Sequence, residues 1–291
     1  MILLMNKLPV AKRAQILAML CEGTSMRAIS RLADVSINTV SKLLIDAGKV
    51  CAQIHDEDVR GVTAKRVQVD EIWSFTYAKN KNVTEKIAEA VEGAGDTWTW
   101  TAIDADSKLI VSWLVGGRGA EYALPFMHDL KMRLANRVQL TSDGHRAYLE
   151  AVEDAFGIDV DYAQLVKIYG SSSTEDQRRY SPVECRGAVK NEVCGSPDPK
   201  HISTSFAERQ NLTMRMHMRR FTRLTNGFSK KLENHIHMVA LYTVFYNFTK
   251  VHKTLRVTPA MEAGLTDRVW TMNEIVEQMD RAALVPAAQP D

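Results

Sequence analysis

The stretch VQVDEIWSF, residues 67–75, places two adjacent carboxylates inside an apolar run that has the character of a β-strand. Asp is disfavoured in strand interiors, and a buried charge is costly unless a partner neutralises it. Because side chains alternate along a strand, we expect Asp70 and Glu71 not to face the same site. Val67, Val69 and Trp73 share the parity of Glu71, so that carboxylate is expected either to pair with a basic neighbour or to support a site from behind.

The sequence that follows residue 65 predicts a mixed sheet with helices against it. Period-two alternation indicates strands, and longer amphipathic segments indicate helices. The expected strands are 65–77, 97–104, 108–117, 137–143 and 160–167, and the expected helices are 120–136 and 145–157. This βββαβαβ order predicts an α/β fold with a mixed five-stranded sheet flanked by helices. Residues 168–202, rich in Ser, Pro and Gly, are expected to form a long irregular insertion.

The first 49 residues are expected to form a small all-α domain. Residues 9–48 show three short helical patterns, and the last two are separated by a tight turn at 34–36. That pattern is typical of a helix-turn-helix, and the outward side chains of the third helix would then reach base edges or phosphates. These side chains are Asn38, Thr39, Ser41 and Lys42. A three-helix bundle without a ligand is the alternative. Residues 50–64 are expected to be a linker.

Charge is concentrated in two segments of a chain whose formal net charge is only +2. Residues 1–50 contain seven Lys or Arg against three Asp or Glu, and residues 208–231 contain seven against one. Basic segments of this kind favour a polyanionic partner. The sequence shows no secretory signal and no apolar run long enough for a membrane span, so a cytoplasmic location is expected. Cys185, Cys194 and His201 match no common zinc spacing.

Three carboxylates have the order and placement of a site for divalent cations. Asp70 lies midway along the first strand, Asp143 ends the fourth strand in LTSDG, and Glu208 opens a helix. In folds of this order the first and fourth strands are neighbours, which would bring Asp70 and Asp143 together. Two Mg²⁺ ions held by carboxylates can assist phosphoryl displacement. Taken singly, Asp143 also suits a turn and Glu208 suits the first turn of a helix.

The helix that contains Glu208 also presents groups suited to DNA. Asn211 and Arg215 follow Glu208 at i+3 and i+7, so the three share one helix face. Arg219 and Arg220 continue the basic run. A carboxylate with a cation two turns later on the same face would suit a DNA phosphate passing over the site.

The motifs VDEIWSF, TSDGHRAY and ERQNLTMRMHMRRFTRLTNGFSKKLENH resemble those of DDE transposases of the insertion-sequence-one family. The resemblance covers roughly residues 65–260 and leaves 261–291 as a C-terminal helix and tail. It implies an RNase H-like catalytic core in which Asp70, Asp143 and Glu208 bind two Mg²⁺, with Mn²⁺ as a substitute. It also implies that Arg215 contacts the end of the element.

The activity implied by this resemblance is metal-dependent cleavage at insertion-sequence ends, followed by strand transfer into target DNA. The expected partners are double-stranded DNA and a second copy of the chain, because two ends must be held together. The expected location is the nucleoid of a bacterial cytoplasm. Two alternatives stay open: a DNA-binding regulator or domesticated transposase that does not cut, and an RNase H-like nuclease.

Overall fold

The computed structural model describes residues 7–169, 185–222 and 225–284. They belong to two compact units. Unit 1 comprises residues 1–60, 72–99 and 211–291, and unit 2 comprises residues 61–71 and 100–210. Among the described residues, no helix combines the length and the apolar character needed to cross a membrane.

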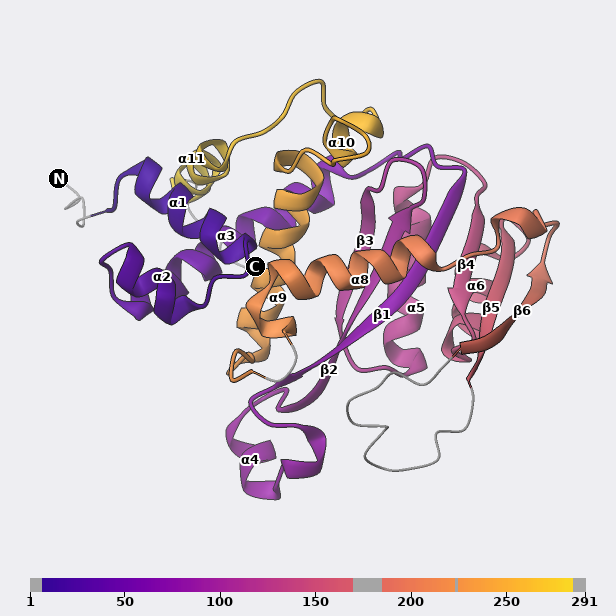
Figure 1. Cartoon of the computed structure of the whole chain (residues 1–291), viewed down its shortest axis with the longest axis horizontal. Coiled ribbons are helices and arrows are strands. Elements are labelled where there is room, and N and C mark those ends of the chain that lie inside the picture. Colours follow the sequence, from indigo (N-terminus) through magenta and orange to yellow (C-terminus); the bar gives the residue numbers. More distant parts are fainter. Residues whose placement is uncertain (1–6, 170–184, 223–224, 285–291) are drawn as a thin grey trace, which may run out of the picture. The chain divides into compact units, whose positions relative to one another are not determined.

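A six-stranded mixed sheet, with strand order β3-β2-β1-β4-β5-β6, positions the carboxylates (Figure 1). Its strands are β1 (Arg66–Thr76), β2 (Gly95–Asp104), β3 (Ile110–Gly116), β4 (Gln139–Asp143), β5 (Asp161–Tyr169) and β6 (Cys185–Cys194). The neighbours β1, β4 and β5 run parallel, whereas β5 and β6 are antiparallel. The predicted adjacency of the first and fourth strands is therefore confirmed, and the predicted number of five strands was wrong.

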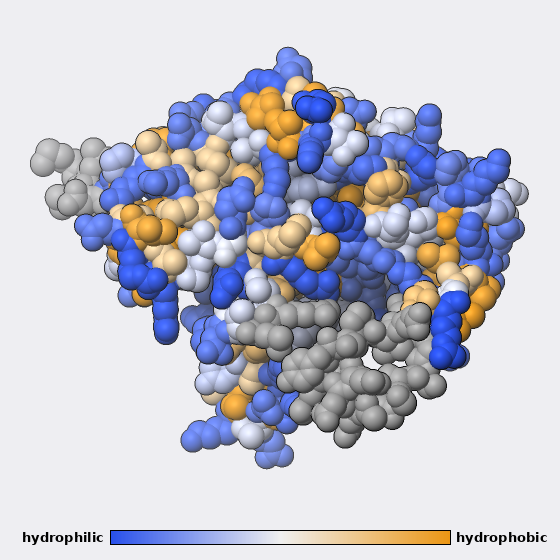
Figure 2. Space-filling view, in the orientation of Figure 1, coloured by the Kyte–Doolittle hydropathy of each residue, from blue (hydrophilic) through white to orange (hydrophobic). Residues whose placement is uncertain are grey.

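The sixth strand lies in the segment that was expected to be irregular. β6 pairs with β5 along most of its length, for example Val166 with Val189. Nearly every side chain of β6 is exposed, so CRGAVKNEVC has no buried face and lacks the alternation that signals a strand. Figure 2 shows hydrophobic atoms at this end of the sheet, where Val166, Ile168 and Val189 are exposed. Residues 170–184 of the predicted insertion lie outside the described residues.

The two cysteines of this segment stand at opposite ends of β6. A strand rises about 3.3 Å per residue, so a ten-residue strand separates Cys185 and Cys194 by roughly 30 Å. They therefore do not share one zinc site.

Helices cover both faces of the sheet in unit 2 (Figure 1). On one face lie α5 (Ala120–Arg133) and α6 (Ala147–Phe156). The ring of Trp100 on β2 contacts Phe126 of α5 and Tyr148 of α6, at centroid distances of 5.8 and 5.3 Å. On the other face the beginning of α8 (Ser205–His217) is fixed by Gln68 of β1, whose Oε1 accepts from the backbone N–H of Phe206 at 2.8 Å.

Unit 1 contains the three N-terminal helices and most of the C-terminal ones. The former are α1 (Val10–Cys21), α2 (Met26–Leu32) and α3 (Ile37–Asp58), and the latter are α9 (Leu232–Val244), η4 (Phe245–Thr249), α10 (Pro259–Glu262) and α11 (Met272–Ala282). The short elements η1 (Asn80–Asn82), α4 (Glu85–Ala90) and η3 (Arg219–Phe221) also belong to it. Ser25 and Ser36 cap α2 and α3 with their side-chain oxygens. The three predicted N-terminal helices are confirmed. Residues 1–60 group with residues 72–99 and 211–291 in unit 1, whereas residues 61–64 belong to unit 2.

The third helix does not end at Gly48, where a helix end was expected, but continues to Asp58. Residues 50–58 of the predicted linker are therefore helical. Gly48 is needed for close packing instead, because a Cβ placed there would lie 2.3 Å from Cβ and 2.6 Å from Cα of His237 on α9.

We expect Gly48→Ala to destabilise the protein by about 2–4 kcal/mol, since the contacting atoms are close to backbone and overpacking is costly. The better helix propensity of Ala, worth about 1 kcal/mol, does not offset this loss. Urea denaturation would measure the change. Gly187→Ala is the matched control, because no atom lies within 4 Å of the Cβ that it adds. Equal stability of the two variants would contradict the packing role of Gly48.

Candidate active site

Two of the predicted carboxylates meet because they lie on paired parallel strands of unit 2. The register of β1 and β4 aligns Arg66 with Gln139 and Gln68 with Thr141. Asp70 and Asp143 each lie two residues beyond the second of these pairs. One carboxylate oxygen from each of Asp70, Glu71 and Asp143 lies within 4.8 Å of the other two. The structure therefore brings Asp70 and Asp143 together, and adds Glu71 to the cluster.

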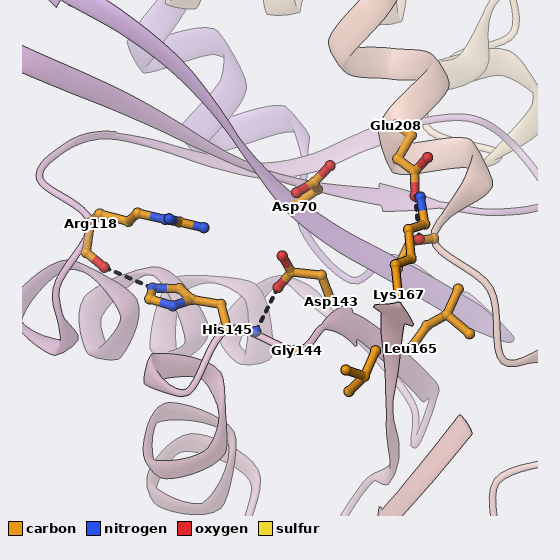
Figure 3. A pocket seen from close by; sticks show the side chains of 10 residues that line it. Asp70, Arg118, Asp143, Gly144, His145, Leu165, Lys167 and Glu208 are labelled. Carbon is orange, nitrogen blue, oxygen red and sulfur yellow. Dashed lines mark hydrogen bonds and ion pairs between the residues drawn. The ribbon is translucent and has the colours of Figure 1, made fainter. Parts of the chain in front are cut away.

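The carboxylate of Asp143 is fixed by the turn that follows β4. Its Oδ1 accepts from the backbone N–H of His145 at 2.9 Å (Figure 3). The ring of His145 in turn contacts the backbone carbonyl of Arg118, with Nε2 at 2.9 Å from the oxygen. Asp143 is thus both a turn residue and a member of the site, so the two readings of this residue are compatible.

Asp70 is the most strongly perturbed carboxyl of the site. Burial, followed by the charges of Glu71 and Asp143, raises its pKa to about 7. The backbone N–H of Glu71 donates to Asp70 Oδ1 at 2.9 Å and opposes the shift in part. Negative charge on Asp70 is therefore costly near neutral pH unless a cation is close by.

Glu71 has two partners on the α5 and α6 side of the sheet. Its side chain is only 1% exposed, and its Oε1 lies 2.7–2.8 Å from the guanidinium nitrogens of Arg118. The hydroxyl of Tyr148 donates to Oε2 at 3.0 Å. Burial and the charge of Asp143 raise the pKa of Glu71, and the hydrogen bond from Arg118 lowers it in part. The expectation that Glu71 pairs with a basic neighbour is therefore confirmed.

The expectation that alternation separates Asp70 from Glu71 was only half right. Gln68, which has the parity of Asp70, contacts the start of α8, whereas Glu71 contacts Tyr148 on the opposite face. Alternation fixes the direction of each Cβ atom, but a Glu carboxylate lies several bonds farther out. An oxygen of Glu71 consequently lies within 4.8 Å of oxygens of both Asp70 and Asp143.

We expect Arg118→Met to destabilise the protein by about 1–3 kcal/mol at neutral pH, because it leaves the buried Glu71 carboxylate without its cation. Removal of one partner of a fully buried pair costs about 3–5 kcal/mol, and the 45% exposure of the Arg118 side chain reduces that figure. Adding Glu71→Gln should recover part of the loss in urea denaturation.

Arg66→Met is the control for this substitution, because its ion pair with Asp106 is more exposed and is expected to contribute less than about 1 kcal/mol. The role assigned to Arg118 is wrong if both substitutions have the same small effect.

Glu208 lies on the cavity side of α8, near but outside the cluster of three carboxylates. Its Oε1 accepts from the Thr204 hydroxyl at 2.5 Å and forms an ion pair with Lys167 of β5. In the described residues, the set of carboxylates that meet within 4.8 Å is Asp70, Glu71 and Asp143, without Glu208. Glu208 nevertheless contributes to the electrostatic environment that raises the pKa of Asp70.

A cavity of about 480 Å³ joins these groups (Figure 3). Its charged lining consists of three carboxylates and two cations, namely Asp70, Asp143, Glu208, Arg118 and Lys167. Hard divalent cations prefer carboxylate oxygens, and burial, together with the neighbouring carboxylates, raises the pKa of Asp70. The donor set therefore fits a divalent cation such as Mg²⁺.

The four residues predicted to read DNA lie in the first two turns of α3. Asn38 and Lys42 are exposed, whereas Thr39 and Ser41 are half-buried. The backbone N–H of Thr39 donates to the capping Ser36 hydroxyl, and Lys42 forms an i,i+4 ion pair with Asp46. Contact of these residues with DNA stays a prediction.

The residues after Glu208 that are predicted to bind DNA differ in their surroundings. Asn211 is buried, Arg215 is half-buried and Arg219 is exposed. The guanidinium of Arg220 donates to the carbonyl of Asn234 and to the hydroxyl of Ser229, and burial lowers its pKa to about 10. These bonds hold the Arg220 side chain within unit 1, and its contact with DNA stays a prediction.

Sequence reasoning did not identify Arg118, Lys167 and Tyr148 as parts of the site. Lys167 had a weaker signal, because a lysine inside the strand DYAQLVKIY is less unusual than Asp70 inside β1. Arg118 lies in a short Gly-rich connection and Tyr148 in an ordinary amphipathic helix. Only the fold shows that both contact Glu71.

No known family model and no curated protein sequence matches this chain. Among solved structures, the chain is similar to a piggyBac transposase in a synaptic complex with hairpin DNA, with a TM-score of 0.39 and 8% sequence identity. The alignment covers 96% of this chain and 73% of the transposase chain. Similarity at this level does not establish a shared fold, so the function has to be inferred from the residues of the site.

Proposed function

We propose that this chain is a DNA transposase with a DDE mechanism, related to the insertion-sequence-one family and built on an RNase H-like core. One observation supports the proposal most. Asp70 and Asp143 meet on neighbouring parallel strands, and Glu208 lines the same cavity, although the three are far apart in sequence. The motifs VDEIWSF, TSDGHRAY and ERQN, on which the family resemblance depends, contain these three residues.

In this proposal Asp70, Asp143 and Glu208 hold two Mg²⁺, with Mn²⁺ as a substitute. When bound, such ions activate an attacking oxygen and stabilise a leaving oxygen in phosphoryl displacement. The remaining groups hold these ligands in place. His145 orients Asp143 through its backbone N–H, and Thr204 orients Glu208 through its hydroxyl.

Two cations of the cavity wall suit a substrate with a phosphate backbone. Arg118 neutralises Glu71 and still lines the cavity, and Lys167 lines it from the Glu208 side. Lysine and arginine near phosphates provide most of the sequence-independent affinity for DNA. We propose that Lys167 turns from Glu208 toward a phosphate when Glu208 binds a cation.

Recognition of the element ends is assigned to the N-terminal helices, through Asn38, Thr39, Ser41 and Lys42, and to Asn211, Arg215 and Arg219. We further propose that the chain acts as a dimer or higher assembly, because cleavage at both ends requires two active sites. Its substrate would be chromosomal DNA in a bacterial cytoplasm.

The proposal is tested by incubating the full chain with linear DNA that contains both flanks of its own gene, together with a supercoiled target plasmid and Mg²⁺ or Mn²⁺. The expected products are nicks at defined positions in the flanks and joined target DNA. Sequence-specific binding without any cleavage would support the regulator instead. Preferential cutting of RNA–DNA hybrids would support the nuclease.

A further inference from the structure

Unit 1 contains a second cavity, of about 490 Å³, in which no residue of the proposed catalytic site takes part. It lies between the end of β1 and residues 220–222 and 225–228. Its lining includes three aromatic residues, one lysine and one asparagine, namely Trp73, Phe75, Phe228, Lys79 and Asn226. This volume is in the usual range of small-molecule sites.

The aromatic residues form a continuous wall. The rings of Trp73 and Phe75 have centroids 5.9 Å apart, and those of Phe75 and Phe228 are 4.8 Å apart with an angle of 33° between their planes. All three side chains are only partly buried, so part of each ring is accessible from the cavity. An aromatic core cluster would normally be covered completely, and this one is not.

Cations lie over these rings. Lys79 Nζ is 5.7 Å from the Trp73 centroid and 5.9 Å from that of Phe75, and Lys230 Nζ is 3.8 Å from the Phe228 centroid. Among the described residues that line the cavity there is no carboxylate. The site therefore repels cationic ligands and attracts anionic ones.

Hydrogen bonds of the neighbouring Ser229 hold the Phe228 part of this aromatic wall in place. Ser229 pairs with Thr76 in a parallel bridge, and its carbonyl accepts from the backbone N–H of Tyr77 at 2.7 Å. The guanidinium of Arg220 donates to the Ser229 hydroxyl at 3.2 Å and to the carbonyl of Asn234. These bonds fix Ser229, the residue next to Phe228, against the end of β1.

A ligand for this cavity has to combine a flat apolar ring with negative charge. A nucleotide has both, since its base stacks on aromatic side chains and its phosphate pairs with lysine. A base inside a duplex is already stacked and paired, so its faces are not accessible. An unpaired nucleotide presents both faces and also a hydrogen-bonding edge, which Asn226 at the rim can contact.

We propose that this cavity binds an unpaired nucleotide of a DNA strand, with its base against Trp73, Phe75 and Phe228 and its phosphate beside Lys79. The inference rests on the proposed function only in taking the nucleotide from DNA rather than from solution.

The test uses the full chain and a DNA duplex with a short single-stranded overhang that contains the fluorescent base 2-aminopurine. A blunt duplex and free 2-aminopurine nucleotide are the comparison probes. Stacking in the cavity should quench the overhang probe, and the chain should bind it more tightly than the blunt duplex. Trp73→Ala should weaken overhang binding about tenfold, since stacking contributes about 1–3 kcal/mol per base, and should leave blunt-duplex binding unchanged. Trp73→Phe should retain most of the quenching.

Lys79→Glu is the second variant, because Lys79 is exposed and its replacement does not threaten folding. It should weaken overhang binding by a similar factor. Equal binding of overhang and blunt probes, or no effect of either variant, would overturn the proposal, as would equal quenching of the free nucleotide. Asp70→Asn should retain the quenching. Strand transfer without any effect of the Trp73 variants would thus refute nucleotide binding in this cavity and leave the proposed transposase activity intact. Trp73-dependent quenching without strand transfer would refute the transposase activity and leave nucleotide binding intact.

Discussion

Replacing Asp70 by Ala should abolish cleavage and strand transfer, with a loss of at least about three orders of magnitude in rate. That loss corresponds to ~4 kcal/mol of transition-state stabilisation. The reason is geometric, because Asp70 belongs to the carboxylate cluster and, unlike Glu71, also lines the cavity with Asp143 and Glu208. The same assay should show losses of similar size for Asp143→Asn and Glu208→Gln.

The three substitutions should impair catalysis without weakening DNA binding. Binding of flank DNA, measured by gel shift, should stay within about twofold of wild type for each of the three variants. Asp154→Asn is the matched control, since this carboxylate of α6 is 57% exposed and pairs with His128 away from the cavity. Unimpaired strand transfer by Asp70→Ala would remove the DDE assignment altogether.

Asp70→Asn should make the protein more stable at pH 8 in the absence of divalent cations. The pKa of Asp70 is raised from 3.8 to about 7 in the folded protein, chiefly by burial. The folded state therefore holds the proton more tightly than the unfolded state. Stability from this group is fully present below about pH 4 and is lost as the pH rises toward 7. The loss can reach about 4 kcal/mol, since each pKa unit corresponds to about 1.4 kcal/mol.

Urea denaturation at pH 5 and pH 8, with EDTA and with Mg²⁺, measures this effect. Wild type should lose free energy of unfolding between the two pH values in EDTA and regain it when Mg²⁺ is added, because a cation replaces the proton. Asp70→Asn should show a smaller fall and little response to Mg²⁺. A variant that is less stable than wild type at pH 8 in EDTA would show that the buried charge of Asp70 does not destabilise the folded protein.

Much of the fold followed from local patterns. The alternation in TWTWTAID and KLIVSWLVGG predicted β2 and β3, and the amphipathic segments around Phe126 and Val152 predicted α5 and α6. The failures have one physical cause, since both depend on contacts distant in sequence. β6 is a strand because β5 pairs with it, and α3 continues past Gly48 because α9 packs against that glycine.

The candidate site also combines residues that local sequence patterns predict with residues that only contacts distant in sequence bring there. Asp70 and Asp143 were predictable because a charge inside a strand and an Asp-Gly strand end are visible locally, and parallel pairing brings them together. Arg118 and Tyr148 contact Glu71 through the fold alone, 47 and 77 residues away. Their role could not be inferred from spacing. The ion pair of Glu208 with Lys167 likewise depends on β5 lying beside β4.

The structure offers two sets of carboxylates for a cation, and one measurement separates them. A crystal structure obtained with Mn²⁺, with the ions located by anomalous diffraction, should show manganese bound by Asp70, Asp143 and Glu208, and Lys167 released from Glu208. Manganese held by Asp70, Glu71 and Asp143, with Glu208 still paired to Lys167, would contradict the proposed DDE site.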